Sequence, residues 1–180
     1  MAKATLTFNE KETFGEMLAE FPQVFSEEPG LTDVLEHHLD TGKSPPVSTS
    51  PYYLPPVKRD ALDGILDDML RRGQIEPCSG PWASPVIVRK KKDGNWRMIV
   101  DYRKVNEVTK KDKYPLSRID ELLDTLGQPK YITVLDLQSG YWQVKLSKDS
   151  QEKAAFITPR GLFKPKVMMF GMCNSGATFS

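Results

Sequence analysis

An aspartate near the middle of the chain could take part in metal chemistry. Asp136 follows apolar and β-branched residues at positions 131–135, a pattern that predicts a central, buried strand ending at this aspartate. A carboxylate held at the end of a rigid strand suits a hard cation such as Mg²⁺, which prefers oxygen ligands. The alternative is an aspartate that caps the turn at residues 138–140, and Asp136 taken alone favours this turn.

A group of cations surrounds a predicted hairpin turn. Asp93-Gly94 is a turn signal between predicted strands at residues 85–89 and 96–100. The cations beside the turn are Arg89, Lys90, Lys91, Lys92 and Arg97. Convergent cations suit a triphosphate or a sugar-phosphate backbone, because phosphate contacts dominate nucleic-acid affinity. The alternative is a lysine-rich sheet edge that discourages aggregation.

Helices and strands that would position these residues interleave along the chain. A first helix has capping-box spacing at Asn9 and Glu12 and ends before Pro22, and the cap of a last helix is predicted at residues 174–175. Apolar stripes predict two further helices, at residues 62–70 before Gly73 and at residues 119–126 before Gly127. Further short strands are predicted at residues 131–135, 142–146, 154–158 and 162–168. The hairpins indicate an α+β fold with a mainly antiparallel sheet and flanking helices.

Charge is distributed unevenly, although the net charge is only +1. Residues 1–42 hold two basic and nine acidic residues, whereas residues 86–118 hold eleven basic and four acidic ones. The basic block predicts a surface that faces a polyanion, with a solvated charged face as the alternative. No segment is apolar enough to predict a signal peptide or a membrane span. Cys78 and Cys173 lack metal-ligand spacing, so we expect reduced thiols and an intracellular protein, cytoplasmic, nuclear or both.

A series of ordered motifs resembles the reverse transcriptase of gypsy-type LTR retrotransposons, which are relatives of retroviral polymerases. The resemblance covers roughly residues 37–179. Its main motifs are, in chain order, Ser84-Pro85-Val86-Ile87-Val88, Lys90-Lys91-Lys92-Asp93-Gly94, Trp96-Arg97, Val100-Asp101-Tyr102-Arg103, Tyr114-Pro115-Leu116, Leu135-Asp136-Leu137, Ser139-Gly140-Tyr141-Trp142-Gln143-Val144 and Phe170-Gly171.

The resemblance implies a right-hand polymerase fold, of which this chain would form the fingers and the first part of the palm. Residues 1–42 would be an acidic lead-in with one short helix, and residues 43–180 the fingers and an incomplete palm. In the family's two-metal mechanism, Asp136 would bind both Mg²⁺ ions and the Leu137 carbonyl would assist. The implied partners are an RNA or DNA template-primer, a deoxynucleoside triphosphate and the remainder of a Pol polyprotein.

The resemblance also assigns a nucleotide site. Lys91 and Arg97 would hold the phosphates, and the backbone N–H groups of Ser139 and Gly140 would contact the triphosphate. The Tyr141 ring would exclude a ribose 2′-hydroxyl; the alternative is an aromatic side chain that packs at the sheet rim. The resemblance places Phe170 in the wall of the nucleotide pocket. Arg103 would grip the template or support the fold.

The sequence departs from the family pattern in its acidic residues. The family's catalytic set includes two adjacent aspartates on a later hairpin, and no Asp-Asp pair follows Asp136; the pair Asp67-Asp68 falls on the second predicted helix. One carboxylate cannot hold two divalent ions, so we expect this chain to be catalytically incomplete by itself. The alternative function is a non-catalytic nucleic-acid-binding or interaction module. Met169 and Gly176 also replace family prolines, and residues 164–166 depart from the usual sequence, so these departures lie nearer to Phe170 than to Asp136 in the chain.

Overall fold

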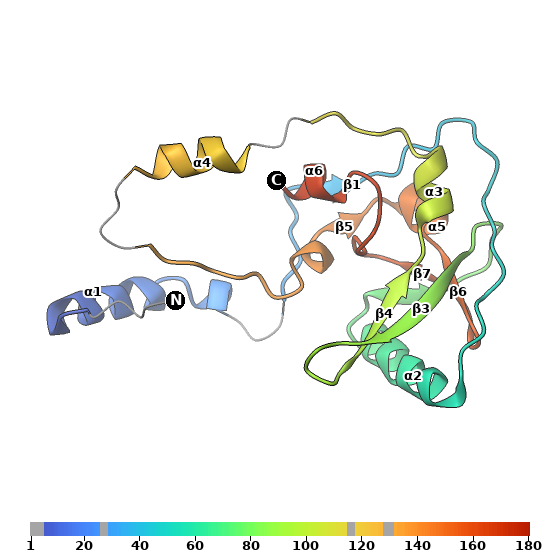
Figure 1. The fold of residues 1–180 in the computed structure, drawn as a ribbon, viewed down its shortest axis with the longest axis horizontal. Helices are drawn as coiled ribbons and strands as arrows, with labels where there is room; N and C mark the ends of the chain where they lie inside the picture. The colour runs from blue at the N-terminus through green and yellow to red at the C-terminus, as the bar shows by residue number, and fades with distance from the viewer. Residues whose placement is uncertain (1–5, 26–28, 115–117, 128–131) are drawn as a thin grey trace. The chain divides into compact units, whose positions relative to one another are not determined.

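The computed structural model describes residues 6–25, 29–114, 118–127 and 132–180. The chain divides into two compact units (Figure 1). The smaller unit comprises residues 1–30 and 117–138, and the larger unit comprises residues 31–116 and 139–180. These units differ from the sequence division at residue 42, which stays a prediction.

The larger unit is built on a five-stranded sheet with the strand order β2-β7-β6-β3-β4. The strands are β2 (Ile75–Pro77), β3 (Ser84–Lys90), β4 (Trp96–Val100), β6 (Phe156–Thr158) and β7 (Gly161–Pro165). Neighbouring strands are antiparallel except for the parallel pair β3 and β6. A separate parallel pair joins β1 (Glu36–His37) to β5 (Lys145–Leu146). The predicted α+β fold with a mainly antiparallel sheet is confirmed.

Helix α2 (Pro56–Arg71) packs against this sheet through its apolar face. Proline is favourable at its first position because the first N–H groups of a helix lack intrahelical partners, and Gly73 follows its end with φ of 66°. Leu62, Leu66 and Met69 are buried in the core of the larger unit. Each such side chain contributes about 2 kcal/mol to folding. The helix predicted from the apolar stripe at residues 62–70 is therefore confirmed.

Three short helices complete the larger unit: α3 (Arg103–Val108), α5 (Lys148–Lys153) and α6 (Ser175–Phe179). Helix α6 begins where the sequence predicts, but the Asn174 side chain does not cap it. This side chain instead accepts a hydrogen bond from the Asp112 N–H and donates one to the Lys110 carbonyl. The strand predicted at residues 142–146 is shorter than expected, because a 3₁₀-helix, η2 (Gly140–Gln143), precedes β5. Cys78 and Cys173 are free and half-buried.

The smaller unit contains helix α1 (Phe8–Ala19), the 3₁₀-helix η1 (Pro22–Phe25) and helix α4 (Ile119–Leu126). Helix α1 has a capping box, but Thr7 and Glu10 form it rather than the predicted Asn9 and Glu12. Helix α4 ends at Gly127 as predicted, and its apolar face is exposed in the structure. No helix within the described residues is long and apolar enough to cross a membrane.

The strand predicted before Asp136 is not formed in the described part of the chain. Residues 132–138 have no regular secondary structure, and Tyr131 lies outside the described residues. Ile132 and Leu135 are each 66% exposed, so the apolar alternation does not mark a buried strand here. A strand needs a neighbour to accept its backbone hydrogen bonds, and none of the described strands pairs with this segment.

Candidate functional site

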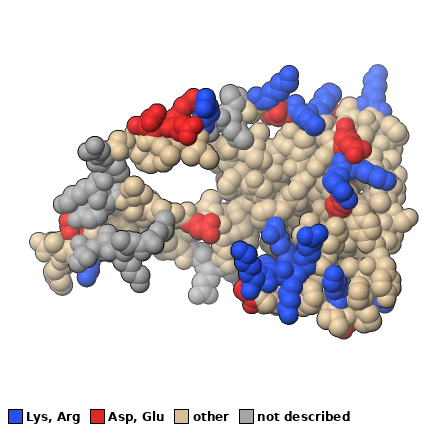
Figure 2. All heavy atoms as spheres, in the orientation of Figure 1, with Lys and Arg blue, Asp and Glu red and all other residues tan. Residues whose placement is uncertain are grey.

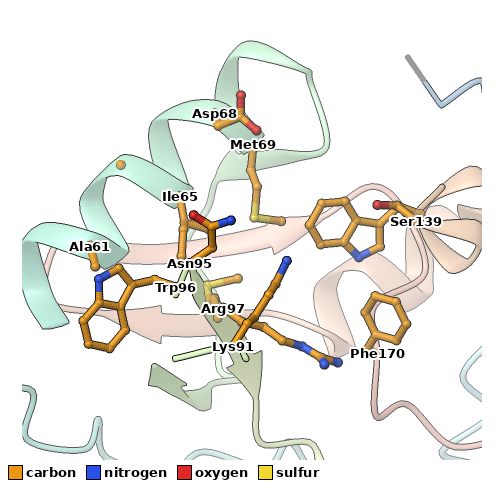
Figure 3. A pocket seen from close by; sticks show the side chains of 13 residues that line it. Ala61, Ile65, Asp68, Met69, Lys91, Asn95, Trp96, Arg97, Ser139 and Phe170 are labelled. Atoms are coloured by element: carbon orange, nitrogen blue, oxygen red, sulfur yellow. The ribbon is translucent and has the colours of Figure 1, made fainter. Parts of the chain in front are cut away.

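A cavity of about 730 Å³ opens within the larger unit (Figure 3). Its volume falls in the range of about 300–1,000 Å³ that is usual for ligand sites. Helix α2 forms one side with Ala61, Gly64, Ile65, Asp68 and Met69. The hairpin contributes Lys91, Asn95, Trp96, Arg97 and Met98, and Ser139, Trp142 and Phe170 complete the lining. The cavity therefore unites four residues of the predicted nucleotide site: Lys91, Arg97, Ser139 and Phe170.

The hairpin between β3 and β4 positions the two cations of the cavity. Lys91 N–H donates to the Asn95 carbonyl over 2.7 Å, and Gly94 N–H donates to the Lys91 carbonyl over 3.2 Å. Gly94 has φ of 88°, a left-handed conformation that glycine adopts without steric cost. Hydrogen bonds led by that from the Asn95 N–H hold the pKa of Asp93 below its usual range. The predicted hairpin is confirmed, because β3 and β4 pair in antiparallel fashion on either side of the turn. Lysine and arginine side chains gather around this turn (Figure 2).

Arg97 contacts an aromatic ring instead of a carboxylate. Its guanidinium carbon lies 5.2 Å from the centroid of the Phe170 ring, within the usual range of a cation–π interaction. The Phe170 ring centroid lies 5.1 Å from that of Tyr141 and 6.4 Å from that of Trp142. No acidic side chain of the described residues forms an ion pair with Lys91 or Arg97, although the charge of Lys91 helps to lower the pKa of the nearby Asp93.

The segment from Ser139 to Trp142 meets the cavity only in part. Ser139 lines it and has φ of 53°, and its carbonyl accepts a hydrogen bond from the Trp142 N–H over 2.8 Å at the start of η2. Gly140 and Tyr141 are not lining residues. Tyr141 is half-buried between the rings of Phe170 and Phe179, in the manner of a packing aromatic. Its predicted contact with the sugar therefore stays a prediction.

Trp142 is a lining residue that the sequence did not identify. The sequence gives Trp142 only as part of the motif at residues 139–144, without a role of its own, whereas the structure places it in the cavity wall. Its indole N–H is buried without a hydrogen-bond partner among the described residues. An unpaired buried donor costs about 1–3 kcal/mol. The position of Trp142 next to Tyr141, a predicted nucleotide-site residue, was the sequence signal that could have identified it.

Arg103 lies at a second, smaller cavity of about 250 Å³ and is paired there. Its Nε donates to Asp101 Oδ1 over 2.9 Å, and its Nη2 donates to Asp101 Oδ2 over 2.7 Å. The Tyr52 hydroxyl donates to the same carboxylate over 2.9 Å. The hydrogen bond from Arg103, assisted by Tyr52, holds the pKa of Asp101 far below its usual range. The predicted contact of Arg103 with the template stays a prediction.

Asp136 and Leu137 belong to the smaller unit, where both are exposed. In the described ranges, no three side chains of His, Cys, Asp or Glu gather in a way that could hold a metal ion. Two divalent cations need more than one carboxylate, so the described residues do not fit the predicted pair of Mg²⁺ ions. The metal-binding roles of Asp136 and Leu137 stay predictions.

Comparison with known proteins identifies the family. The family model of reverse transcriptase (RNA-dependent DNA polymerase) matches residues 88–180. The Drosophila melanogaster retrovirus-related Pol polyproteins from transposons 297 and opus are each 34% identical, over 83% and 94% of this chain respectively. An RNA-directed DNA polymerase homolog of Oenothera berteroana is 48% identical over 46% of this chain and 58% of its own length.

Solved structures agree with this assignment. Prototype foamy virus protease-reverse transcriptase is 27% identical, with a TM-score of 0.86 over 98% of this chain and 24% of its own. A foamy viral protease-reverse transcriptase solved in complex with double-stranded DNA is 26% identical, with the same TM-score over 98% of this chain and 32% of its own. The chain spans 14% and 18% of the two Drosophila polyproteins. The right-hand polymerase fold inferred from the motifs is confirmed, and the chain belongs to the reverse transcriptase family.

Proposed function

We propose that this chain supplies part of the incoming-nucleotide site of an RNA-directed DNA polymerase. That polymerase would extend a primer on an RNA or DNA template with deoxynucleotides. This proposal rests on the cavity, which is lined by Lys91, Arg97, Ser139 and Phe170. The comparisons do not favour the alternative of a non-catalytic module, because the matched relatives are Pol polyproteins and reverse transcriptases.

The chemistry of the cavity suits a nucleoside triphosphate. Two unpaired cations face the cavity, and a triphosphate is a compact polyanion that both can contact. Arg97 can bind one phosphate through two parallel N–H groups, whereas Lys91 acts as a point charge. The remaining wall is aromatic and apolar at Trp142 and Phe170, which suits the sugar and base.

The other components of the reaction would come from beyond these residues. Divalent metal use is general among reverse transcriptases, but the described residues do not form a complete metal site. The function proposed for this chain is therefore nucleotide binding, with the two Mg²⁺ ions held in the longer protein. Foamy viral relatives have been solved with double-stranded DNA and with an RNA/DNA hybrid. A template-primer of either kind is the proposed polymer partner.

Calorimetric titration of the 180-residue chain with dATP tests the proposal. Removing a charged partner of a phosphate costs about 1.5–3 kcal/mol, so Lys91→Ala and Arg97→Ala should each weaken binding about tenfold or more. Lys92→Ala is the matched control, because Lys92 is the next residue of the same hairpin and does not line the cavity. The proposal fails if the wild type does not bind dATP, or if Lys92→Ala weakens binding as much as Lys91→Ala.

A further inference from the structure

The contact between Arg97 and Phe170 leaves the donors of Arg97 free. A guanidinium group carries five N–H donors in one plane, and a phenyl ring has no oxygen or nitrogen acceptor that could engage them. The guanidinium carbon lies 5.2 Å from the Phe170 centroid. Within the described residues, no carboxylate forms an ion pair with Arg97. The ring can therefore hold the cation in place without consuming the donors that would bind a phosphate.

Phe170 is itself fixed from two directions. The rings of Tyr141 and Trp142 pack beside it, with centroids 5.1 Å and 6.4 Å away. The loop that follows is tied to helix α3 by Asn106. The Asn106 Nδ2 donates to the Gly171 carbonyl over 2.8 Å, and the Asn106 Oδ1 accepts from the Cys173 N–H over 2.8 Å. A ring held in this way can support the Arg97 side chain.

Arg103 shows the opposite arrangement within the same unit. Two of its donors are engaged by one carboxylate, that of Asp101. A phosphate would have to compete with this carboxylate at Arg103. At Arg97 no carboxylate of the described residues forms an ion pair, and Asp68, which also lines the cavity, is paired with Arg71 and Arg72. Support by an aromatic ring therefore keeps an arginine both ordered and available.

We propose that Phe170 is a positioning residue, which holds the guanidinium of Arg97 so that its donors face a polyphosphate in the cavity. This inference rests on the proposed function, because it concerns the same cavity. It predicts that the aromatic ring, rather than apolar volume alone, determines the affinity for phosphate. A tyrosine at position 170 should therefore preserve the affinity for phosphate, whereas a leucine should lower it.

Calorimetric titration with sodium tripolyphosphate, without added metal, is the test. Phe170→Leu should weaken binding about threefold, as expected for the loss of an exposed cation–π contact. Phe170→Tyr should bind tripolyphosphate as tightly as the wild type, because it keeps an aromatic ring. In an Arg97→Gln background, Phe170→Leu should have no further effect, since the cation that the ring supports is absent. Urea unfolding of each variant separates a loss of affinity from a loss of folding, and Phe170→Met replaces the leucine variant if that variant unfolds.

The possible outcomes separate the two proposals. A wild-type chain that binds dATP but not tripolyphosphate overturns this inference alone, whereas a wild-type chain that binds neither overturns the proposed function as well. Binding that depends on Arg97 but is unchanged by Phe170→Leu overturns the positioning role alone. The same holds if Phe170→Leu weakens binding equally with and without Arg97. A threefold loss that disappears in the Arg97→Gln background supports the inference.

Discussion

Arg97 and Arg103 lie six residues apart, and the structure places them in opposite chemical situations. Arg97 contacts the Phe170 ring and lines the larger cavity without an anionic partner among the described residues. Arg103 lines the smaller cavity and forms a two-pronged ion pair with Asp101. Both are exposed, and the sequence predicts a phosphate contact for Arg97 and a template contact or a fold-supporting role for Arg103. The neighbour of an arginine, rather than its exposure, therefore determines whether its donors are available to a ligand.

Breaking the ion pair should make the two arginines alike. Asp101→Asn removes the charge that engages Arg103, so the affinity for single-stranded nucleic acid should rise. The slope of log K against log salt should steepen by about 0.7 for one added phosphate contact. Filter binding of a labelled oligonucleotide at several salt concentrations measures this slope. Glu107→Gln is the control, because it removes the same charge beside the same cavity. If the slope steepened equally in both variants, the change in net charge would explain it, and the prediction that Arg103 is released would be wrong.

The ion pair should also make stability depend on acid pH. The hydrogen bond from Arg103 lowers the pKa of Asp101 in the folded chain, so this carboxylate stabilises the fold above its unfolded pKa of about 3.9. The stabilisation, on the order of 1 kcal/mol, should be lost as pH falls below about 4. Urea unfolding of the wild type and Asp101→Asn at pH 6 and pH 3 gives the comparison. A difference between them that stayed constant with pH would contradict this account.

The smallest effect should come from the α2 wall of the larger cavity. Gly64 is an exposed glycine inside α2, and a Cβ atom there would meet no atom within 4 Å. Alanine should therefore stabilise the chain by about 0.5–1 kcal/mol, measured by urea unfolding. A concurrent loss of dATP affinity would show that the ligand approaches this wall. If stability fell instead, the described packing of α2 would be wrong.

Elements with local signals could be predicted from the sequence. The hairpin depends on Asp93-Gly94, and the structure has Gly94 in the left-handed conformation that this turn requires. Helix α2 follows from its apolar stripe and ends near Gly73 as expected. The motifs also identified Lys91, Arg97, Ser139 and Phe170, which the structure brings to one cavity.

Features that depend on distant neighbours could not be predicted in this way. The apolar alternation before Asp136 signals a strand, but a strand also needs a partner, and the described strands provide none for residues 132–135. The left-handed conformation of Ser139 starts a 3₁₀-helix where the sequence favoured a strand. That turn puts Trp142 in the cavity wall and packs Tyr141 behind Phe170. The ion pair between Arg103 and Asp101 could not be predicted from the sequence either, because it depends on how the two side chains are oriented.

The assignment of the larger cavity as the nucleotide site can be tested on the arginine side-chain NMR signals of the 180-residue chain. In a nitrogen-15 NMR titration with dATP, the Nε–H signals of Arg97 and Arg103 are assigned by Arg97→Lys and Arg103→Lys. We expect the Arg97 signal to shift with a saturable dependence on dATP, while the Arg103 signal stays in place because Asp101 binds that guanidinium group. A shift of the Arg103 signal with no change at Arg97 would contradict the assignment of the larger cavity as the nucleotide site.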